Sequence, residues 1–281
     1  MTADAIRGRR ARTGKTKLIG EAVTIIAVVL VFLVLRTLVF QPFTIPSASD
    51  EPNLVQGDYI IVSKSAYGWS KHSIPLSPPL FSGRLFFHAP QRGDVIVFKL
   101  PRVLDGRVDY IKRLVGLPGD RLQVKAGVVY INGAPLPRTR LAPGLGNVLA
   151  GYAPVQRYME TASNGRRYIV QQDGENGPAD NTGVYVVPPH CYFVMGDNRD
   201  NSLDSRFDPQ MPPDASGAAT CGWNNGPDQY LPPDSGVGFV PEENLVGRAV
   251  MILFSWNPEA AARDGGGFLG LRANRFARPV G

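Results

Sequence analysis

The chain has 281 residues, 43% of them hydrophobic, and its 30 Lys and Arg against 24 Asp and Glu give a net charge of +6. This length suffices for a packed core in one large or two smaller domains. The positive charge gathers at the ends: residues 1–17 carry +5 and residues 257–281 carry +2, which leaves −1 for the residues between them. We therefore expect a lipid bilayer as a partner, and no nucleic-acid-binding face on the folded part of the chain.

The first predicted element is a transmembrane helix over residues 18–40. Its only charged residues are Glu21 and Arg36, near the two ends. These 23 residues reach across a hydrocarbon core of about 30 Å at about 1.5 Å per residue. The basic tip, residues 1–17, precedes the span, so the positive-inside rule places the tip in the cytoplasm and everything after Phe40 outside.

The alternative to this anchor is a cleavable signal peptide, since Ser47, Ala48 and Ser49 offer small residues. The apolar run is longer than the 7–15 residues of a signal-peptide core, and Pro46 lies within the would-be cleavage site. An uncleaved anchor is therefore favoured. The other reading, an exported β module with its signal peptide still attached, would be distinguished by a mature N-terminus near Ala48.

After the anchor the pattern becomes that of a mostly β protein with an antiparallel sheet. Short runs rich in Val, Ile, Tyr and Phe are bounded by Gly, Pro or Asp. The dipeptide Asn132-Gly133 is the strongest hairpin signal in the chain. The predicted strands lie within residues 58–64, 93–100, 108–117, 120–133, 167–172, 183–197 and 244–256.

Other segments interrupt these strands. Residues 65–92 combine many apolar side chains with prolines and glycines, which indicates either an interfacial surface or a loop folded onto the core. Residues 137–165 and 207–236 are predicted as long loops, and the chain from about Pro258 as a mobile tail.

The two cysteines, Cys191 and Cys221, would lie on the oxidising side of the membrane. There they could form a disulfide, or Cys191 could remain a buried free thiol, and the sequence leaves both open.

Two serines, Ser47 and Ser49, stand in a turn directly after the span. A serine hydroxyl becomes a nucleophile when a base takes its proton, and a neutral lysine can do so where burial disfavours the ammonium form. The candidate is Lys112, which strand alternation places on one face with Tyr110 and Leu114. The bland alternative is an edge-strand lysine that reaches into water.

A run of polar residues, GDNRDNSLDSR at 196–206, follows a predicted buried strand. A calcium loop is excluded because Arg199 stands at the third ligand position and Ser202 replaces the glycine needed at the sixth. The run reads as a rigid platform behind a site, or as a solvated loop. No cluster of Cys or His points to a metal.

These pieces together resemble the type I signal peptidases, membrane-anchored Ser/Lys endopeptidases that remove signal peptides. The matching motifs, in the family's order, are IPSASDEPNL, RGDVIVF, YIKRLVGLPGD, YFVMGDNRDNSLDSR and FVPEENLVGRA. The resemblance implies a bacterial plasma membrane protein without a cofactor, with its catalytic domain on the outer, periplasmic side. It also implies exported preproteins with small residues before the cut as substrates.

The same resemblance implies a division into domains. Residues 41–120 and 190–256 would form the catalytic domain, and residues 121–189 an inserted β subdomain.

The resemblance also implies roles for individual residues. Ser49 would be the nucleophile and Lys112 the general base. Ser47 would donate to the oxyanion hole beside the backbone N–H of Ser49, and Ser202 would orient the lysine by a hydrogen bond. Supporting ion pairs would join Asp197 to Arg113 and Asp204 to Arg206.

The departure from the family is Asp50, where Met usually follows the nucleophile; Asn53 also replaces a usual Thr. Strand-like alternation predicts that Asp50 points away from the Ser49 hydroxyl. A carboxylate near a catalytic lysine opposes its neutral form, so a second reading is a membrane-anchored relative that binds signal peptides without cutting them.

Overall fold

The structure is a computed structural model. It describes residues 3–74, 76–102, 106–148, 151–174, 177, 179–207, 221, 236–256 and 270–281.

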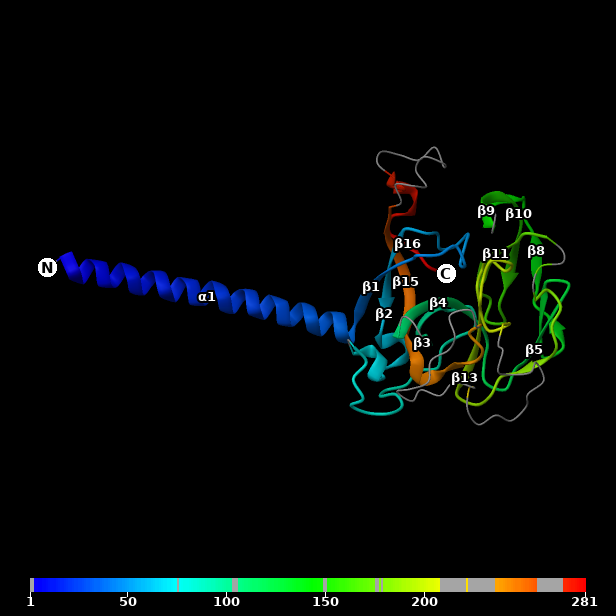
Figure 1. Ribbon diagram of the computed structural model, residues 1–281, viewed down its shortest axis with the longest axis horizontal. Coiled ribbons are helices and arrows are strands. Elements are labelled where there is room, and N and C mark those ends of the chain that lie inside the picture. Colours follow the sequence, from blue (N-terminus) through cyan, green and yellow to red (C-terminus); the bar gives the residue numbers. More distant parts are fainter. Residues whose placement is uncertain are drawn as a thin grey trace.

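One long helix, α1 (Ala3–Leu38), extends away from a β-rich body (Figure 1). Within the described residues it is the one helix long and apolar enough to cross a membrane, over Lys17–Leu38 with a mean hydropathy of 2.9. Its side chains there lie outside the packed core, as a lipid-facing helix requires. The predicted span overruns the helix by two residues, because Phe40 already begins the first strand, β1 (Phe40–Thr44).

The main sheet is antiparallel and, among the described residues, has eight strands. Its order is β1-β2-β15-β3-β4-β13-β14, with β16 paired to β15. The other strands are β2 (Asp58–Ser63), β3 (Val95–Arg102), β4 (Gly106–Gly116), β13 (Cys191–Met195), β14 (Val240–Pro241), β15 (Leu245–Ser255) and β16 (Arg278–Pro279). The prediction of a mostly β, antiparallel fold is confirmed.

The main sheet is covered on both faces, which explains its nearly continuous apolar strands. In β3, Ile96 and Phe98 pack into one core together with Leu114 of β4. The alternate residues Val95 and Val97 pack into a second core on the opposite face. The period of two in the side chains thus serves two cores at once.

Two smaller sheets are built from strands within residues 121–189. One has the order β12-β5-β6-β7, and in the other β10 pairs with β8, β9 and β11. Their bounds are β5 (Arg121–Lys125), β6 (Val128–Ile131), β7 (Ala134–Pro135), β8 (Arg138–Arg140), β9 (Gly144–Val148), β10 (Gly151–Thr161), β11 (Arg167–Gln172) and β12 (Tyr185–Val186).

The predicted hairpin at Asn132-Gly133 is confirmed. Ile131 pairs with Ala134 across the turn, and both central residues have positive φ, 54° and 85°. That conformation costs little for Asn and Gly, which is why this dipeptide closes two-residue hairpins.

The prediction of a long loop over residues 137–165 is wrong, because β8, β9 and β10 lie within it. Polar residues and glycines interrupt the apolar ones in these strands, so the regular apolar alternation that marks a strand is absent. Polar contacts replace it: Arg140 donates to Gln156 Oε1 at 2.8 Å, and Gln156 Nε2 donates to the carbonyl of Leu141 at 2.8 Å.

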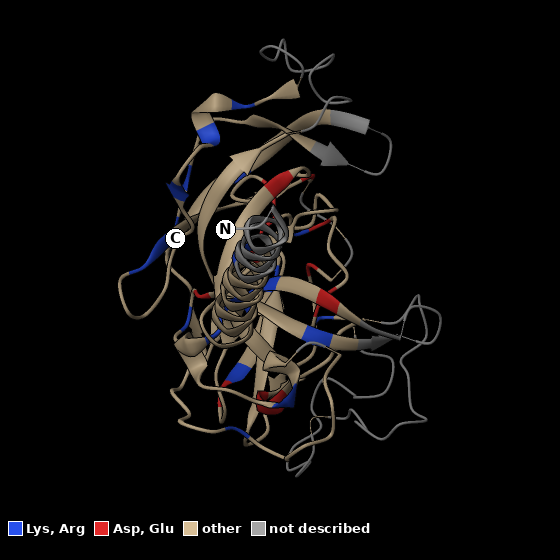
Figure 2. Cartoon of the chain, turned by 90° about the vertical axis from the view of Figure 1, so that its left-hand side faces the viewer, with Lys and Arg blue, Asp and Glu red and all other residues tan. Residues whose placement is uncertain are grey.

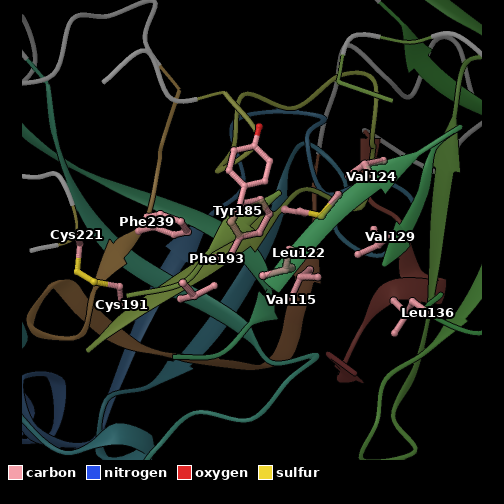
Figure 3. Close-up of a cluster of buried hydrophobic side chains, with 12 residues drawn as sticks. Val115, Leu122, Val124, Val129, Leu136, Tyr185, Cys191, Phe193, Cys221 and Phe239 are labelled. Carbon is pink, nitrogen blue, oxygen red and sulfur yellow. A yellow bond between two sulfur atoms is a disulfide. The ribbon is translucent and has the colours of Figure 1, made fainter. Parts of the chain in front are cut away.

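Cys191 and Cys221 form a disulfide, which settles the question that the sequence left open. The bond lies at the edge of a buried cluster that joins β13 to the β5–β6 hairpin (Figure 3). In this cluster Phe193 lies against Tyr185 and Phe239, with ring centroids 5.2 and 6.0 Å apart. The disulfide thus fixes one residue of the segment 207–236, the rest of which lies outside the described residues except for Phe207 and Gly236.

The end of the chain is packed against the body, so the prediction of a mobile tail is wrong for residues 270–281. A short 3₁₀ helix, η5 (Ala273–Arg275), precedes β16. Arg275 is buried and binds both carboxylate oxygens of Asp58, at 2.8 and 2.5 Å. A buried ion pair with this geometry holds the tail in place. Residues 257–269 lie outside the described residues.

The segment 65–92 has a buried side and an exposed apolar side. Two 3₁₀ helices, η1 (Ser65–Tyr67) and η2 (Lys71–Ser73), pack against the body, as η3 (Glu242–Asn244) does further along the chain. The apolar side chains of Leu76, Leu80 and Phe86 are exposed. Trp69 Nε1 donates to the carbonyl of Leu38 at 2.7 Å, which ties the segment to the end of α1.

Candidate active site

Ser49 and Lys112 come together although 63 residues separate them. Lys112 Nζ donates to Ser49 Oγ at 2.6 Å and to the carbonyl of Ile111 at 2.8 Å. Lys112 is 4% exposed, and its stem lies on the face of β4 that also carries Tyr110 and Leu114. The bland reading, a lysine that reaches into water, is therefore wrong.

The turn that carries Ser49 is held against the residues that follow β13. Asn198 N–H donates to the carbonyl of Ser49 at 3.0 Å, and Asn198 Nδ2 donates to the carbonyl of Ala48 at 3.2 Å. A Cβ at Gly196 would lie 2.4 Å from the carbonyl oxygen of Ser49 and 2.3 Å from Ser202 Oγ. Only glycine allows the two segments to approach this closely.

Ser47 is the second hydroxyl at the site. It is exposed, and its Oγ lies 3.2 Å from Ser49 Oγ. A donor at this distance from a nucleophile can reach the negative charge that forms on a carbonyl oxygen when its carbon is attacked.

Asp50 does not point away from the nucleophile, so that prediction is wrong. Ser49 Oγ donates to Asp50 Oδ2 at 3.4 Å, and the same oxygen lies 3.6 Å from Lys112 Nζ. The reason is local: residues 47–50 form a bend and turn, not a strand, so adjacent side chains need not alternate between faces.

Asp50 is 2% exposed, and burial raises its pKa to about 6. Lys112 opposes this rise, while the nearby carboxylate of Asp197 adds to it. Asp50 Oδ1 is buried without a hydrogen-bond partner among the described residues. The site thus contains a carboxyl whose charge changes at mildly acidic pH, in contact with both candidate catalytic groups.

Ser202 lies beside the same groove but is not hydrogen-bonded to Lys112. Its side chain is 7% exposed, and its Oγ has no hydrogen-bond partner among the described residues. The place beside Lys112 is instead taken by Asp50, at 3.6 Å.

Arg113 and Asp197 form a buried pair behind the site. Arg113 Nε and Nη2 donate to the two Asp197 oxygens, each at 2.7 Å, and the guanidinium stacks 4.1 Å from the Tyr168 ring. Asn53 Nδ2 donates to Asp197 Oδ2 at 2.7 Å and to the carbonyl of Ile169 at 2.6 Å. Asn53 therefore joins the nucleophile turn to β11 and to this pair, which the sequence gave no reason to expect.

Residues of the run 196–206 take part in two more buried pairs, one within the run and one with β10. Arg206 donates to Asp204 through Nε and Nη2, at 2.9 Å each. Although burial opposes ionisation, Arg206 and the N–H of Gly196 hold the pKa of Asp204 below its ordinary value. Arg199 donates to Glu160 of β10 at 2.9 and 2.5 Å. The run is a rigid platform and not a solvated loop.

Glu160 is a site-supporting residue that the sequence analysis missed. It lies in the segment predicted as a loop, and a lone acidic residue there has no pattern that would mark it as buried. Its signal in retrospect is Arg199, an arginine within a polar run that needs a buried partner.

The groove in front of these groups has a volume of about 620 Å³ and is lined by Ser47, Ser49, Tyr110, Lys112, Ser202 and Leu203, among others. This volume is ample for several residues of an extended peptide. Among the described residues, no three His, Cys, Asp or Glu side chains are placed to hold a metal ion. The groove presents the hydroxyls of Ser47 and Ser49 and the amine of Lys112, and the carboxyl of Asp50 lies beside them.

Comparisons with known proteins give relatives that cover about four fifths of the chain. Residues 18–256 match the family described as signal peptidase, peptidase S26. The signal peptidase I of Rickettsia typhi is 37% identical over 236 residues, 81% of this chain and 77% of its own, and that of Rickettsia canadensis is 36% identical over 239 residues, with the same coverage of both chains.

A signal peptidase I from Enterococcus faecalis of known structure covers 57% of this chain and 97% of its own, at 21% identity and a TM-score of 0.29, and it carries no weight here. The family match and the two Rickettsia sequences are enough to assign the family. The chain belongs to the signal peptidase family, peptidase S26.

Proposed function

We propose that this protein is a signal peptidase I, a serine endopeptidase in which Ser49 attacks the scissile carbonyl and Lys112 acts as general base. The observation that carries the residue roles is the 2.6 Å contact between Lys112 Nζ and Ser49 Oγ in a buried setting. A base whose nitrogen lies within about 2.6–3.2 Å of the oxygen that carries the proton meets the geometric requirement for such catalysis.

The reaction is an acyl transfer in two steps. The neutral amine of Lys112 takes the Ser49 proton as Oγ bonds to the carbonyl carbon, and the proton then passes to the leaving amine. Water, deprotonated by Lys112, next breaks the ester bond and restores Ser49. Ser47 Oγ and the Ser49 N–H would hold the negative oxygen of each tetrahedral intermediate.

Asp50 Oδ2 is a competing acceptor for the Ser49 proton. Its distance of 3.4 Å from Ser49 Oγ is at the outer limit of a hydrogen bond, whereas Lys112 Nζ lies at 2.6 Å. Lys112 is therefore the base, and Asp50 acts on it through charge.

The substrates would be exported preproteins with small residues before the cut. Residues 1–17 would lie in the cytoplasm, α1 would cross the plasma membrane once, and the β body would lie on the outer side. The six basic residues before the span support this orientation, and so does the disulfide, which needs an oxidising compartment.

The test is cleavage of a preprotein by the purified full-length chain in detergent, with the new N-terminus identified by sequencing. We expect a single cut after the signal peptide. The matched control is Ser49→Ala, which keeps the fold but lacks the nucleophile. An uncut preprotein at every pH tried would contradict the proposal.

A second candidate function is capture of signal peptides without cleavage. The observation that favours it is the 3.6 Å distance from Asp50 to Lys112, because a carboxylate at this range stabilises the ammonium form, which cannot accept a proton. The same assay separates the two functions: a preprotein that co-purifies with the protein but stays intact supports capture.

A further inference from the structure

A second cavity, of about 200 Å³, lies where α1 meets the β body. Three cations line it, Arg36 from the last turn of α1, Lys64 after β2 and Lys99 of β3, together with one carboxylate, Asp109 of β4. None of the three cations lines the groove at Ser49 and Lys112. Figure 2 looks onto this end of the molecule, with α1 toward the viewer and Lys and Arg in blue.

Positive charge in the cavity exceeds negative charge. Asp109 is already paired, because Lys99 Nζ donates to Asp109 Oδ2 at 2.8 Å. Lys64 is 2% exposed, and its Nζ donates to the carbonyl of Ser73 at 2.5 Å, a neutral acceptor. Among the described residues, no carboxylate forms an ion pair with Arg36 or Lys64.

The surroundings of Lys64 disfavour its charged form. Burial lowers the pKa of Lys64 to about 8; Asp109 opposes this shift, while Arg36 and Lys99 add to it. An anion bound between these groups would offset both the desolvation and the repulsion.

The cavity lies at the depth of lipid headgroups. The apolar span ends at Leu38, two residues beyond Arg36, and Trp69 is hydrogen-bonded to the Leu38 carbonyl. Tryptophan and arginine at the end of a span are typical of the membrane–water interface. Leu76, which also lines the cavity, is fully exposed, and Leu80 and Phe86 of the same segment are exposed as well.

We propose that this cavity binds the phosphate group of an anionic membrane phospholipid, whose acyl chains lie along α1 and the exposed apolar side chains of residues 76–86. Basic pockets beside membrane helices are suited to such headgroups. At about 200 Å³ the cavity is smaller than the roughly 300–1,000 Å³ of sites for drug-sized ligands, which suits a headgroup and not a peptide. The inference rests on the proposed membrane anchoring, but not on the roles of Ser49 and Lys112.

The test measures lipid bound to the full-length protein in a neutral detergent by native mass spectrometry. The protein is titrated with phosphatidylglycerol, with phosphatidylcholine of the same acyl chains, and with inorganic phosphate. We compare the natural protein with Arg36→Gln/Lys99→Gln and with Lys64→Met. The control, Arg121→Gln/Lys125→Gln, removes two exposed cations of β5, far along the chain from the cavity.

We expect the natural protein and the β5 control to retain phosphatidylglycerol in preference to phosphatidylcholine. Both cavity variants should bind phosphatidylglycerol roughly tenfold or more weakly, since each juxtamembrane cation contributes measurably to the binding of anionic lipid. Lys64→Met also covers the case in which the double variant folds poorly, because Met keeps most of the buried volume.

Equal retention of phosphatidylglycerol by all variants would overturn the assignment, and so would inorganic phosphate binding as tightly as the lipid. Preprotein cleavage in the same detergent is measured in parallel. If the cavity variants lose lipid binding but still cleave the preprotein, the cavity is a lipid site separate from the active site. If the natural protein does not cleave the preprotein, the result contradicts the proposed function, and the lipid measurement remains valid.

Discussion

At the scale of single residues, the chemistry depends on three side chains within 3.6 Å of one another. Lys112 Nζ lies 2.6 Å from Ser49 Oγ and 3.6 Å from Asp50 Oδ2. The amine can act as a base only when neutral, and the carboxylate works against that state when ionised. Burial of Lys112 thus favours the neutral amine that can act as a base, whereas the negative charge of Asp50 disfavours it.

The first prediction concerns the Ser49–Lys112 dyad. Ser49→Ala and Lys112→Met should each abolish preprotein cleavage, because one removes the nucleophile and the other its base. Ser47→Ala should instead lower kcat by roughly 10²–10³, as removal of one oxyanion donor typically does. Rates come from mature-product formation on a gel, and circular dichroism checks the fold. Cleavage that survives either dyad change would rule out this mechanism.

The second prediction concerns pH and Asp50. Burial raises the pKa of Asp50 to about 6, so above that pH the carboxylate is ionised and places a negative charge 3.6 Å from the amine that must accept the Ser49 proton. The rising limb of kcat/KM against pH should then lie at alkaline pH. Asp50→Met should raise kcat/KM and move this limb toward neutrality.

A matched control for the pH experiment is Asp200→Asn. Asp200 lines the same groove, but its carboxylate accepts the N–H of Asp173 at 2.7 Å. We expect its pH profile to match that of the natural protein. A limb that stays in place in Asp50→Met while activity rises would indicate substrate contact, and identical profiles at every pH would mean that Asp50 has no effect on the base.

At the scale of elements, the site depends on segments that the sequence did not mark as structural. The third prediction concerns the C-terminal tail, where Arg275 binds Asp58 and donates to the carbonyl of Asn53 at 2.8 Å. Arg275→Met would leave the buried Asp58 without its cation, and loss of one partner of a buried pair costs about 3–5 kcal/mol. We expect the free energy of unfolding in urea to fall by this amount.

Arg278→Gln is the control for the tail, since Arg278 is an exposed residue of β16. Its unfolding should match that of the natural protein. The double variant Asp58→Asn/Arg275→Met should recover part of the loss, because neither charge is then buried alone. Equal stability of Arg275→Met and the natural protein would show that the tail does not support the fold.

Elements with apolar alternation could be predicted from the sequence, whereas those held by polar contacts could not. The residues of β3 and β4 alternate between two cores. The sequence pattern therefore predicts both strands and the face of β4 on which Lys112 lies. The strand β10 carries Glu160, whose partner Arg199 lies 39 residues away, and no local pattern records such a pair. The contact of Asp50 with Lys112 also escaped prediction, because it depends on the turn at Ser49 and not on strand geometry.

At the scale of the whole molecule, successive segments of the chain form separate parts of the structure. The helix α1 stands at one end, and the strands within residues 121–189 form two further sheets (Figure 1). Strand β4 of the main sheet carries Lys112, and the turn between β1 and β2 carries Ser49. We propose that residues 121–189 are an inserted subdomain of the catalytic domain. The groove is lined by residues of β4, of the turn at Ser49 and of the run after β13, so three separate segments of the chain meet at the candidate site.

The last prediction concerns the orientation of the chain in the membrane. Six basic residues in the tip should keep it in the cytoplasm and place the β body outside. The described residues contain no free cysteine, so a single introduced one can report its compartment. In intact cells stripped of any outer membrane, a membrane-impermeant maleimide should label Lys125→Cys but not Thr13→Cys. Both variants should label after detergent treatment, which is the control for access. Labelling of Thr13→Cys in intact cells would reverse the topology and place Ser49 in the compartment where preproteins have not yet been exported.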